Sequence, residues 1–92
     1  MMTSKDFRGS TNPFGVPCQR MKKGTSVIVS IPLPNKEWMD VRGVVTLEPW
    51  WNNGAKTAYL QVRVEEQLTH TDTHNYSGVF AVYFDAVKEV LE

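Results

Sequence analysis

The 92-residue chain lacks several features that define common protein classes. It has one cysteine, Cys18, so it cannot form an internal disulfide or a cysteine-rich zinc site. It has no run of about 18 apolar residues, the length that a membrane-spanning helix needs. Residues 1–8 are too polar for a secretory signal. These absences predict a protein of the reducing cytoplasm with no membrane span.

Net charge is also missing, because ten basic and ten acidic residues balance to zero. Nucleic-acid binding usually depends on a positive field, so this balance argues against generic DNA or RNA binding. The charges are unevenly placed, however. Residues 1–24 hold five bases and one acid, a net +4, and residues 25–92 hold five bases and nine acids, a net −4. A basic N-terminal segment therefore precedes an acidic body.

Catalytic patterns are absent as well. There is no glycine-rich phosphate loop, and no paired carboxylates stand in an apolar setting. Cys18 has no neighbouring histidine to activate it, and we interpret it as a solvent-accessible thiol. The sequence therefore predicts a protein that is not an enzyme, with no catalytic residue and no cofactor.

The N-terminal segment is rich in residues that interrupt regular structure. Glycine, proline, serine and asparagine dominate residues 9–17, with little apolar material to offset the entropy of ordering. We therefore predict a flexible basic arm over residues 1–22, anchored weakly by Phe14 and Val16. Residues 23–92 are predicted to form the folded domain.

That second region has β patterning and almost no helical periodicity. Gly43 predicts a bulge or a close backbone approach, and Asn53-Gly54 predicts a type I′ hairpin turn. Asp85 is expected to cap one helical turn. The expected strands cover residues 26–31, 41–47, 57–65 and 78–84, and residues 89–91 form either a short last strand or the end of a short helix. This pattern predicts an all-β fold, a small five-stranded antiparallel barrel.

The order of particular residues adds a resemblance to a known fold family. The matching pieces are Lys23-Gly24 before a Val-x-Val strand, Trp38 in the first long loop, Arg42-Gly43-Val44-Val45, Leu60-Gln61-Val62-Arg63, and Val87-Lys88-Glu89-Val90 after the fourth strand. In this order they resemble the SH3-like barrels over about residues 23–91. The resemblance implies an SH3-like β-barrel behind the flexible N-terminal arm.

Two families of that fold look most similar in layout. The photosystem I reaction-centre subunit IV family also has an Asn-Tyr-rich loop, which residues 75–78 resemble, and it binds at a membrane complex and helps dock ferredoxin. The plasmid-encoded trimethoprim-resistant dihydrofolate reductases have a similar barrel and arm, and their tetramer forms one active pore. Val79 and Tyr83 could correspond to the first and last residues of their Val-Gln-Ile-Tyr segment. The first resemblance implies protein docking and the second an oligomeric enzyme.

Aromatic residues fall in adjoining loops of the expected domain. Trp50 and Trp51 are neighbours, and neighbours on a strand point opposite ways, so one should face the core and the other solvent. Exposed tryptophan is enriched at binding hot spots, and aromatic loops form peptide-binding or cation-binding grooves. The predicted partner-binding residues are Trp38, Trp50, Trp51, Tyr59 and Arg63.

Two further features suggest contacts. The fourth strand is apolar on both faces, and the face with Val79, Ala81 and Tyr83 has no internal use in one barrel, so it could join copies into a homo-oligomer. His70, Asp72 and His74 would share one side of an extended segment and suit zinc. Because no fourth ligand is evident, no metal site is predicted, and metal binding there is the alternative.

These observations predict a small non-catalytic protein-binding module, an accessory or regulatory subunit that uses an aromatic loop surface. The basic arm would add an electrostatic contact to the partner. One alternative is an oligomeric pore-type enzyme whose site is assembled from symmetry copies. Another is a nucleic-acid-binding barrel, whose affinity should fall steeply with salt.

Overall fold

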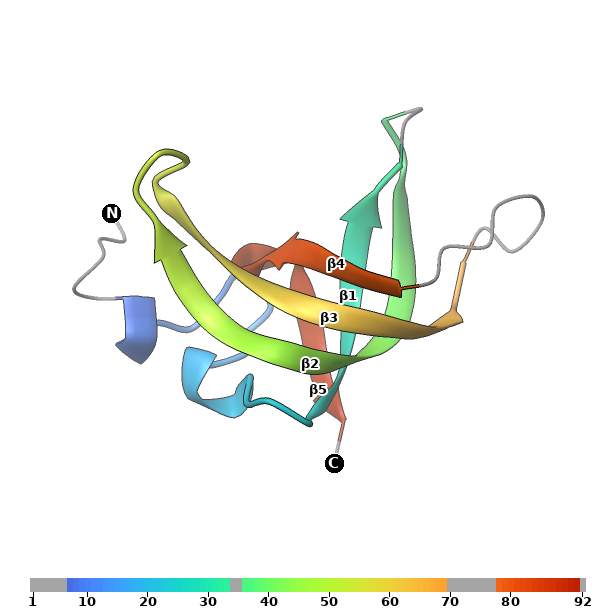
Figure 1. Ribbon diagram of the computed structural model, residues 1–92, viewed down its shortest axis with the longest axis horizontal. Coiled ribbons are helices and arrows are strands. Elements are labelled where there is room, and N and C mark those ends of the chain that lie inside the picture. Colours follow the sequence, from blue (N-terminus) through green and yellow to red (C-terminus); the bar gives the residue numbers. More distant parts are fainter. Residues whose placement is uncertain (1–6, 34–35, 70–77, 92) are drawn as a thin grey trace.

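The computed structural model of the protein describes residues 7–33, 36–69 and 78–91. These residues form five strands and three short 3₁₀ turns (Figure 1). The strands are β1 (Ser26–Pro32), β2 (Trp38–Asn52), β3 (Thr57–Gln67), β4 (Gly78–Tyr83) and β5 (Val87–Leu91). The turns are η1 (Phe7–Gly9), η2 (Cys18–Arg20) and η3 (Phe84–Ala86). The predicted all-β class is confirmed.

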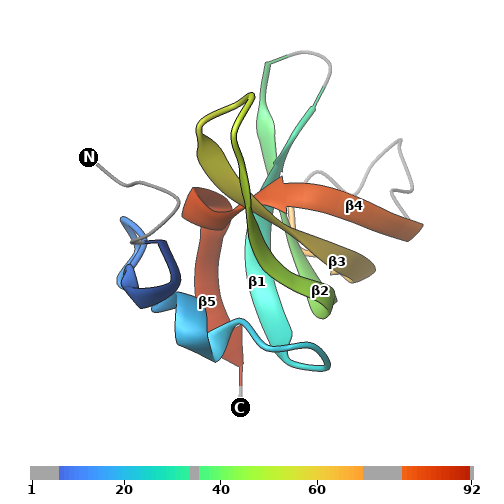
Figure 2. The same cartoon turned by 60° about the vertical axis from the view of Figure 1, so that its left-hand side comes forward.

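The strands form one antiparallel sheet in the order β4-β3-β2-β1-β5. The long strand β2 bends, so that its first part pairs with β1 and its later part with β3 (Figures 1 and 2). β4 and β5 are the two edges, and no pairing joins them among the described residues. The sheet therefore curls without closing. Five antiparallel strands were predicted correctly, whereas the closed barrel was not.

The core lies inside the curl, where alternate residues of each strand meet. Gly43 permits the bend of β2, because a Cβ atom there would collide with Val62 Cγ1 and the Arg63 carbonyl. The pairing register shifts beside it, so the prediction of a bulge with close approach is confirmed. The largest fully buried side chains are Phe84, Met21, Met39, Leu60, Val27, Val29, Val41, Val45, Val62 and Val87.

The N-terminal segment differs most from the sequence-based expectation. In place of a loosely attached arm, residues 7–22 contribute Val16, Cys18 and Met21 to the same buried cluster as the strands. The interpretation of Cys18 as a solvent-accessible thiol is wrong, because this cysteine is buried. Three apolar residues scattered among turn residues have no periodicity, so the pattern alone could not show that they reach the core.

Asn12 fixes this segment against the sheet. Its side-chain Nδ2 donates to the carbonyl oxygens of Phe84 at 2.9 Å and Val87 at 2.6 Å. Its Oδ1 accepts the backbone N–H groups of Phe14 and Val16 at 3.0 and 2.9 Å. One buried amide thus folds residues 12–16 into a turn and ties that turn to the junction of η3 and β5.

Two local turn predictions need correction. The β2–β3 hairpin exists, but residues 53–56 form its loop and Lys56, not Gly54, has positive φ (53°). Asn52 Oδ1 accepts the Ala55 N–H at 2.9 Å, which stabilises this longer loop over a two-residue turn. Asp85 does not cap η3, because Tyr83 occupies the cap position without a side-chain bond.

Candidate functional site

Three aromatic side chains form a row across the outer face of β2, β3 and β4. The cross-strand register places Trp50 opposite Tyr59 and Tyr59 opposite Tyr83. The ring centroids are 6.0 Å apart in the first pair and 5.0 Å apart in the second, which is stacked. These spacings are typical of favourable aromatic pairs. We call Trp50, Tyr59 and Tyr83 the outer aromatic row.

The Tyr59 hydroxyl stays uncharged at neutral pH. Desolvation raises the pKa of Tyr59 above its usual value, and a hydrogen bond with Tyr83 raises it further. The row therefore offers partners flat aromatic faces and a neutral Tyr59 hydroxyl group, a combination that is common at protein-binding surfaces.

A pocket of about 500 Å³ continues the row beyond Tyr83. Three aromatic side chains line it, Tyr83 from β4, Trp38 from the start of β2 and Phe14 from the N-terminal segment. Each is about half exposed, at 41%, 51% and 52% respectively. We call this the Trp38 pocket. Because Tyr83 belongs to both features, the aromatic row and the pocket form one continuous surface.

Charged and polar groups line one side of the Trp38 pocket. Ser30 donates its hydroxyl to Asp40 Oδ1 at 2.6 Å, and Lys88 Nζ donates to Asp40 Oδ2 at 3.0 Å. The Lys88 ammonium also lies 5.8 Å from the Phe14 ring centroid, within cation–π range. Asp85 lines the pocket from η3 and is exposed. The pocket thus combines aromatic rings with charges of both signs.

The pKa of Asp40 reflects these contacts. Partial burial opposes its charged form and raises the pKa, but the Ser30 hydrogen bond and the Lys88 ammonium outweigh that effect. The net result is a pKa below the usual aspartate value, so Asp40 is ionised at neutral pH. Its negative charge holds Lys88 beside the pocket.

The two adjacent tryptophans divide as the alternation rule predicted. Trp50 lies in the outer aromatic row, whereas Trp51 packs against the core. The Trp51 Nε1–H also donates to Asn53 Oδ1 at 2.9 Å. Of the five predicted partner-binding residues, Trp38, Trp50 and Tyr59 therefore lie along the continuous surface, in which Tyr83 joins the row to the pocket. Trp51 is partly buried and packs against the core.

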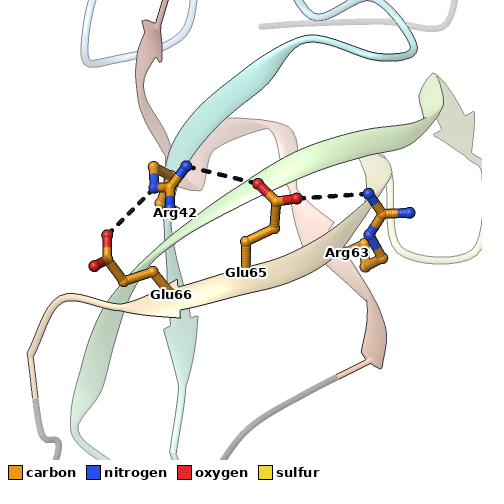
Figure 3. A network of polar contacts seen from close by, with 4 residues as sticks. All are labelled: Arg42, Arg63, Glu65 and Glu66. Atoms are coloured by element: carbon orange, nitrogen blue, oxygen red, sulfur yellow. Dashed lines mark hydrogen bonds and ion pairs between the residues drawn. The ribbon is translucent and has the colours of Figure 1, made fainter.

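Arg63, the fifth predicted residue, is part of an ion-pair network (Figure 3). Its guanidinium lies 3.5 Å from Glu65, and Arg42 contacts Glu65 at 3.6 Å and Glu66 at 3.3 Å. The register pairs Arg42 with Glu66 and Gly43 with Val64, which leaves Glu65 as the extra residue of a bulge. The two glutamates thus pair with the two arginines, and Arg63 is exposed and forms an ion pair with Glu65.

The basic residues of the N-terminal segment gather elsewhere. A depression of about 600 Å³ lies between residues 18–22 and Glu48-Pro49, with Arg8, Arg20 and Lys22 on its rim. Nearby, the Lys23 N–H donates to Glu48 Oε2 at 3.3 Å. Part of the basic segment therefore faces an acid of its own domain. None of the described residues that line this depression is aromatic, which separates it from the Trp38 pocket.

Neither a metal centre nor a membrane helix is found in the described part of the chain. The predicted alternative of His70, Asp72 and His74 lies outside the described residues. Within residues 7–33, 36–69 and 78–91, no group of three or more histidine, cysteine or acidic side chains could hold a metal ion. No helix in those ranges is long and apolar enough to cross a membrane.

Sequence reasoning missed part of the surface. Phe14 was expected to be a weak anchor, yet it lines the pocket, and the Asn12-Pro13 turn signal before it was the available hint. The group of Ser30, Asp40 and Lys88 comes from three strands and has no signature along the chain. Comparisons with protein-family models, with curated proteins and with solved structures found no match to this chain.

Proposed function

We propose that this domain is a non-catalytic protein-binding module of SH3-like type, an accessory or regulatory subunit of the cytoplasm. Its contact surface combines the outer aromatic row with the Trp38 pocket. One observation carries the proposal. Tyr83 stacks on Tyr59 and also lines the pocket with Trp38 and Phe14, so five aromatic side chains form one surface.

The chemistry of this surface favours a protein partner. Half-exposed aromatic side chains beside a mixed-charge rim are the composition of protein-binding hot spots. A nucleic-acid site of this kind would need a positive groove along the aromatic rings. Here Arg63 is paired with Glu65, Lys88 is paired with Asp40, and the chain has no net charge. A pocket of this size fits one or two side chains of a partner segment.

Site-specific photo-crosslinking in the native host would test the proposal. A benzophenone side chain replaces Phe14 at the pocket in one version and Leu68, an exposed apolar residue just after β3 that does not line the pocket, in the matched control. We expect one discrete protein to crosslink at position 14 and not at position 68. Adding Trp38→Ala should reduce the yield at least about tenfold, as loss of a hot-spot tryptophan does, with an unchanged melting temperature.

Three results would contradict the proposal. Equal capture from positions 14 and 68 would show that the surface has no selectivity. Capture that survives Trp38→Ala would place the contact elsewhere. Crosslinked nucleic acid in place of protein, weakening steeply with salt, would favour the nucleic-acid alternative.

A further inference from the structure

One edge of the open sheet, β4, has no partner strand among the described residues. β4 pairs with β3 on one side only, and no described strand pairs with its other side. Gly78, Val79, Ala81 and Tyr83 are all exposed, with Val79 52% exposed. An edge strand presents unpaired N–H and C=O groups, which makes it a template for another strand.

β4 also lacks the devices that usually prevent such pairing. Its sequence, Gly-Val-Phe-Ala-Val-Tyr, contains no charged residue and no proline, and its pairing with β3 runs from Gly78 to Tyr83 without a register shift. Edge strands that must stay single commonly carry lysine, proline or a bulge. The opposite edge, β5, includes Lys88 and Glu89 and is bonded through Val87 to Asn12.

The strand is complementary to itself. In a two-fold antiparallel pair, facing residues lie on the same side of the sheet, so exposed odd-numbered residues must face one another. Centring the pair on Ala81 satisfies this rule, since Ala81 then faces Ala81 of the second copy and Val79 faces Tyr83. A β-branched residue against an aromatic ring is a favourable cross-strand pair. The same register places the inward residues Phe80 and Val82 opposite each other.

We propose that β4 pairs with β4 of a second copy of this chain in this register, which gives a symmetric dimer with one continuous ten-stranded sheet. The proposal does not depend on the proposed function, because edge pairing uses the backbone groups of β4 and, of the outer aromatic row, brings only Tyr83 against the second copy. The absence of charge on β4 removes the repulsion that would keep two copies apart. Because β4 is the one edge left uncovered within residues 7–33, 36–69 and 78–91, assembly stops at two copies.

The expected dimer is weak and reversible. Two paired six-residue strands span only about 20 Å, so the contact falls in the range of small, transient interfaces. Sedimentation equilibrium over about 1–200 µM brackets such an association. We expect the average mass to rise from 10.5 kDa toward twice that value with concentration. A constant monomer mass over this range would overturn the proposal.

Substitutions at Ala81 test the register directly. Ala81→Lys or Ala81→Glu alone places like charges opposite each other, so each should raise the dimer dissociation constant at least about tenfold. An equal mixture of the two variants should restore the dimer as a heterodimer. Mixing Val79→Lys with Val79→Glu should not restore it, because Val79 faces Tyr83 in this register. Rescue at position 79 and not at 81 would refute the register.

A matched control separates edge pairing from stacking of outer faces. Leu47 is an exposed apolar residue in the same cross-strand row as Gln61 and Ala81, two strands away from the edge. Leu47→Lys should leave the dimer unchanged, whereas equal disruption would mean that the faces stack. Hydrogen exchange on the wild-type chain needs no variant to fold. The alternate β4 amides that do not donate to β3 should gain protection with concentration, and concentration-independent exchange of these amides would overturn the proposal.

Discussion

At the β5 edge of the sheet, residues 10–21 lie against the strand and add side chains to the core (Figure 2). At the β4 edge, no described segment pairs with the strand, and its outward residues are exposed. Both edges belong to one small sheet, but only the β5 edge has a described segment of the chain packed against it. The covered edge uses interactions within the chain and contributes to stability. The open edge leaves backbone and apolar groups available for contacts between molecules.

The strongest way to break this contrast is to remove the Asn12 side chain. Asn12→Ala eliminates the bonds to Phe84, Val87, Phe14 and Val16 and leaves buried backbone groups unsatisfied. We expect a loss of about 3 kcal/mol in the free energy of unfolding. Urea denaturation measures it. Thr11→Ala, an exposed neighbour, should change the free energy of unfolding by less than about 0.5 kcal/mol. Similar losses for both variants would show that the Asn12 side chain does not hold this segment against the sheet.

A matched pair of valines compares the two edges with the same chemical change. Val16 is 7% exposed in the covering segment, and Val79 is 52% exposed on the open edge. Val16→Ala should lower the free energy of unfolding by about 2 kcal/mol through lost burial and a cavity. Val79→Ala should change it by less than about 0.5 kcal/mol. Both are measured by denaturation at concentrations where the chain is monomeric, and equal effects would erase the contrast.

The reactivity of Cys18 reports whether residues 10–21 stay packed against β5 and the core. Burial raises the pKa of its thiol above the usual value, Arg8 opposes that rise and Glu48 adds to it. Less thiolate and less access should slow its reaction with a thiol reagent at pH 8 at least about tenfold relative to the unfolded chain. Asn12→Ala should recover part of that rate. A native rate equal to the unfolded rate would show that the segment opens freely.

The strands were predictable because their determinants are local. Alternating or continuous runs of β-branched and apolar residues located the first four, although β2 is longer than the expected residues 41–47, and residues 89–91 fit either a strand or a helix end. Gly43 marked the bend of β2. Neighbour alternation also separated Trp50 from Trp51. Asn53-Gly54 predicted a type I′ turn that does not form, because the Asn52 side chain stabilises a longer loop.

The packing of residues 10–21 and the Trp38 pocket both depend on contacts between residues far apart in the sequence. Asn12 bonds to carbonyl groups more than 70 positions away, and no local pattern encodes such a partner. The pocket joins Phe14, Trp38 and Tyr83 from three separate parts of the chain. Sequence could show that these aromatic residues exist, but the curl of the sheet decides which of them meet.

The smallest expected effect on stability concerns the ion pair between Lys88 on β5 and Asp40 on β2. Lys88 on β5 reaches across β1 to Asp40 on β2, where Ser30 also donates a hydrogen bond. The pKa of Asp40 in the folded state lies below its usual value. A lowered pKa adds stability that is complete above about pH 5 and is lost as the pH falls below about 4.

Because the pair is partly exposed, Asp40→Asn should remove only about 0.5–1 kcal/mol at pH 7. The difference between wild type and variant should shrink as the pH falls from 7 to 3, as chemical denaturation at both values would show. Asp85→Asn, an exposed acid on neighbouring η3, serves as the matched control and should follow wild type at both pH values. A wild-type advantage that persists unchanged at pH 3 would mean that the charge on Asp40 does not hold β5 in place.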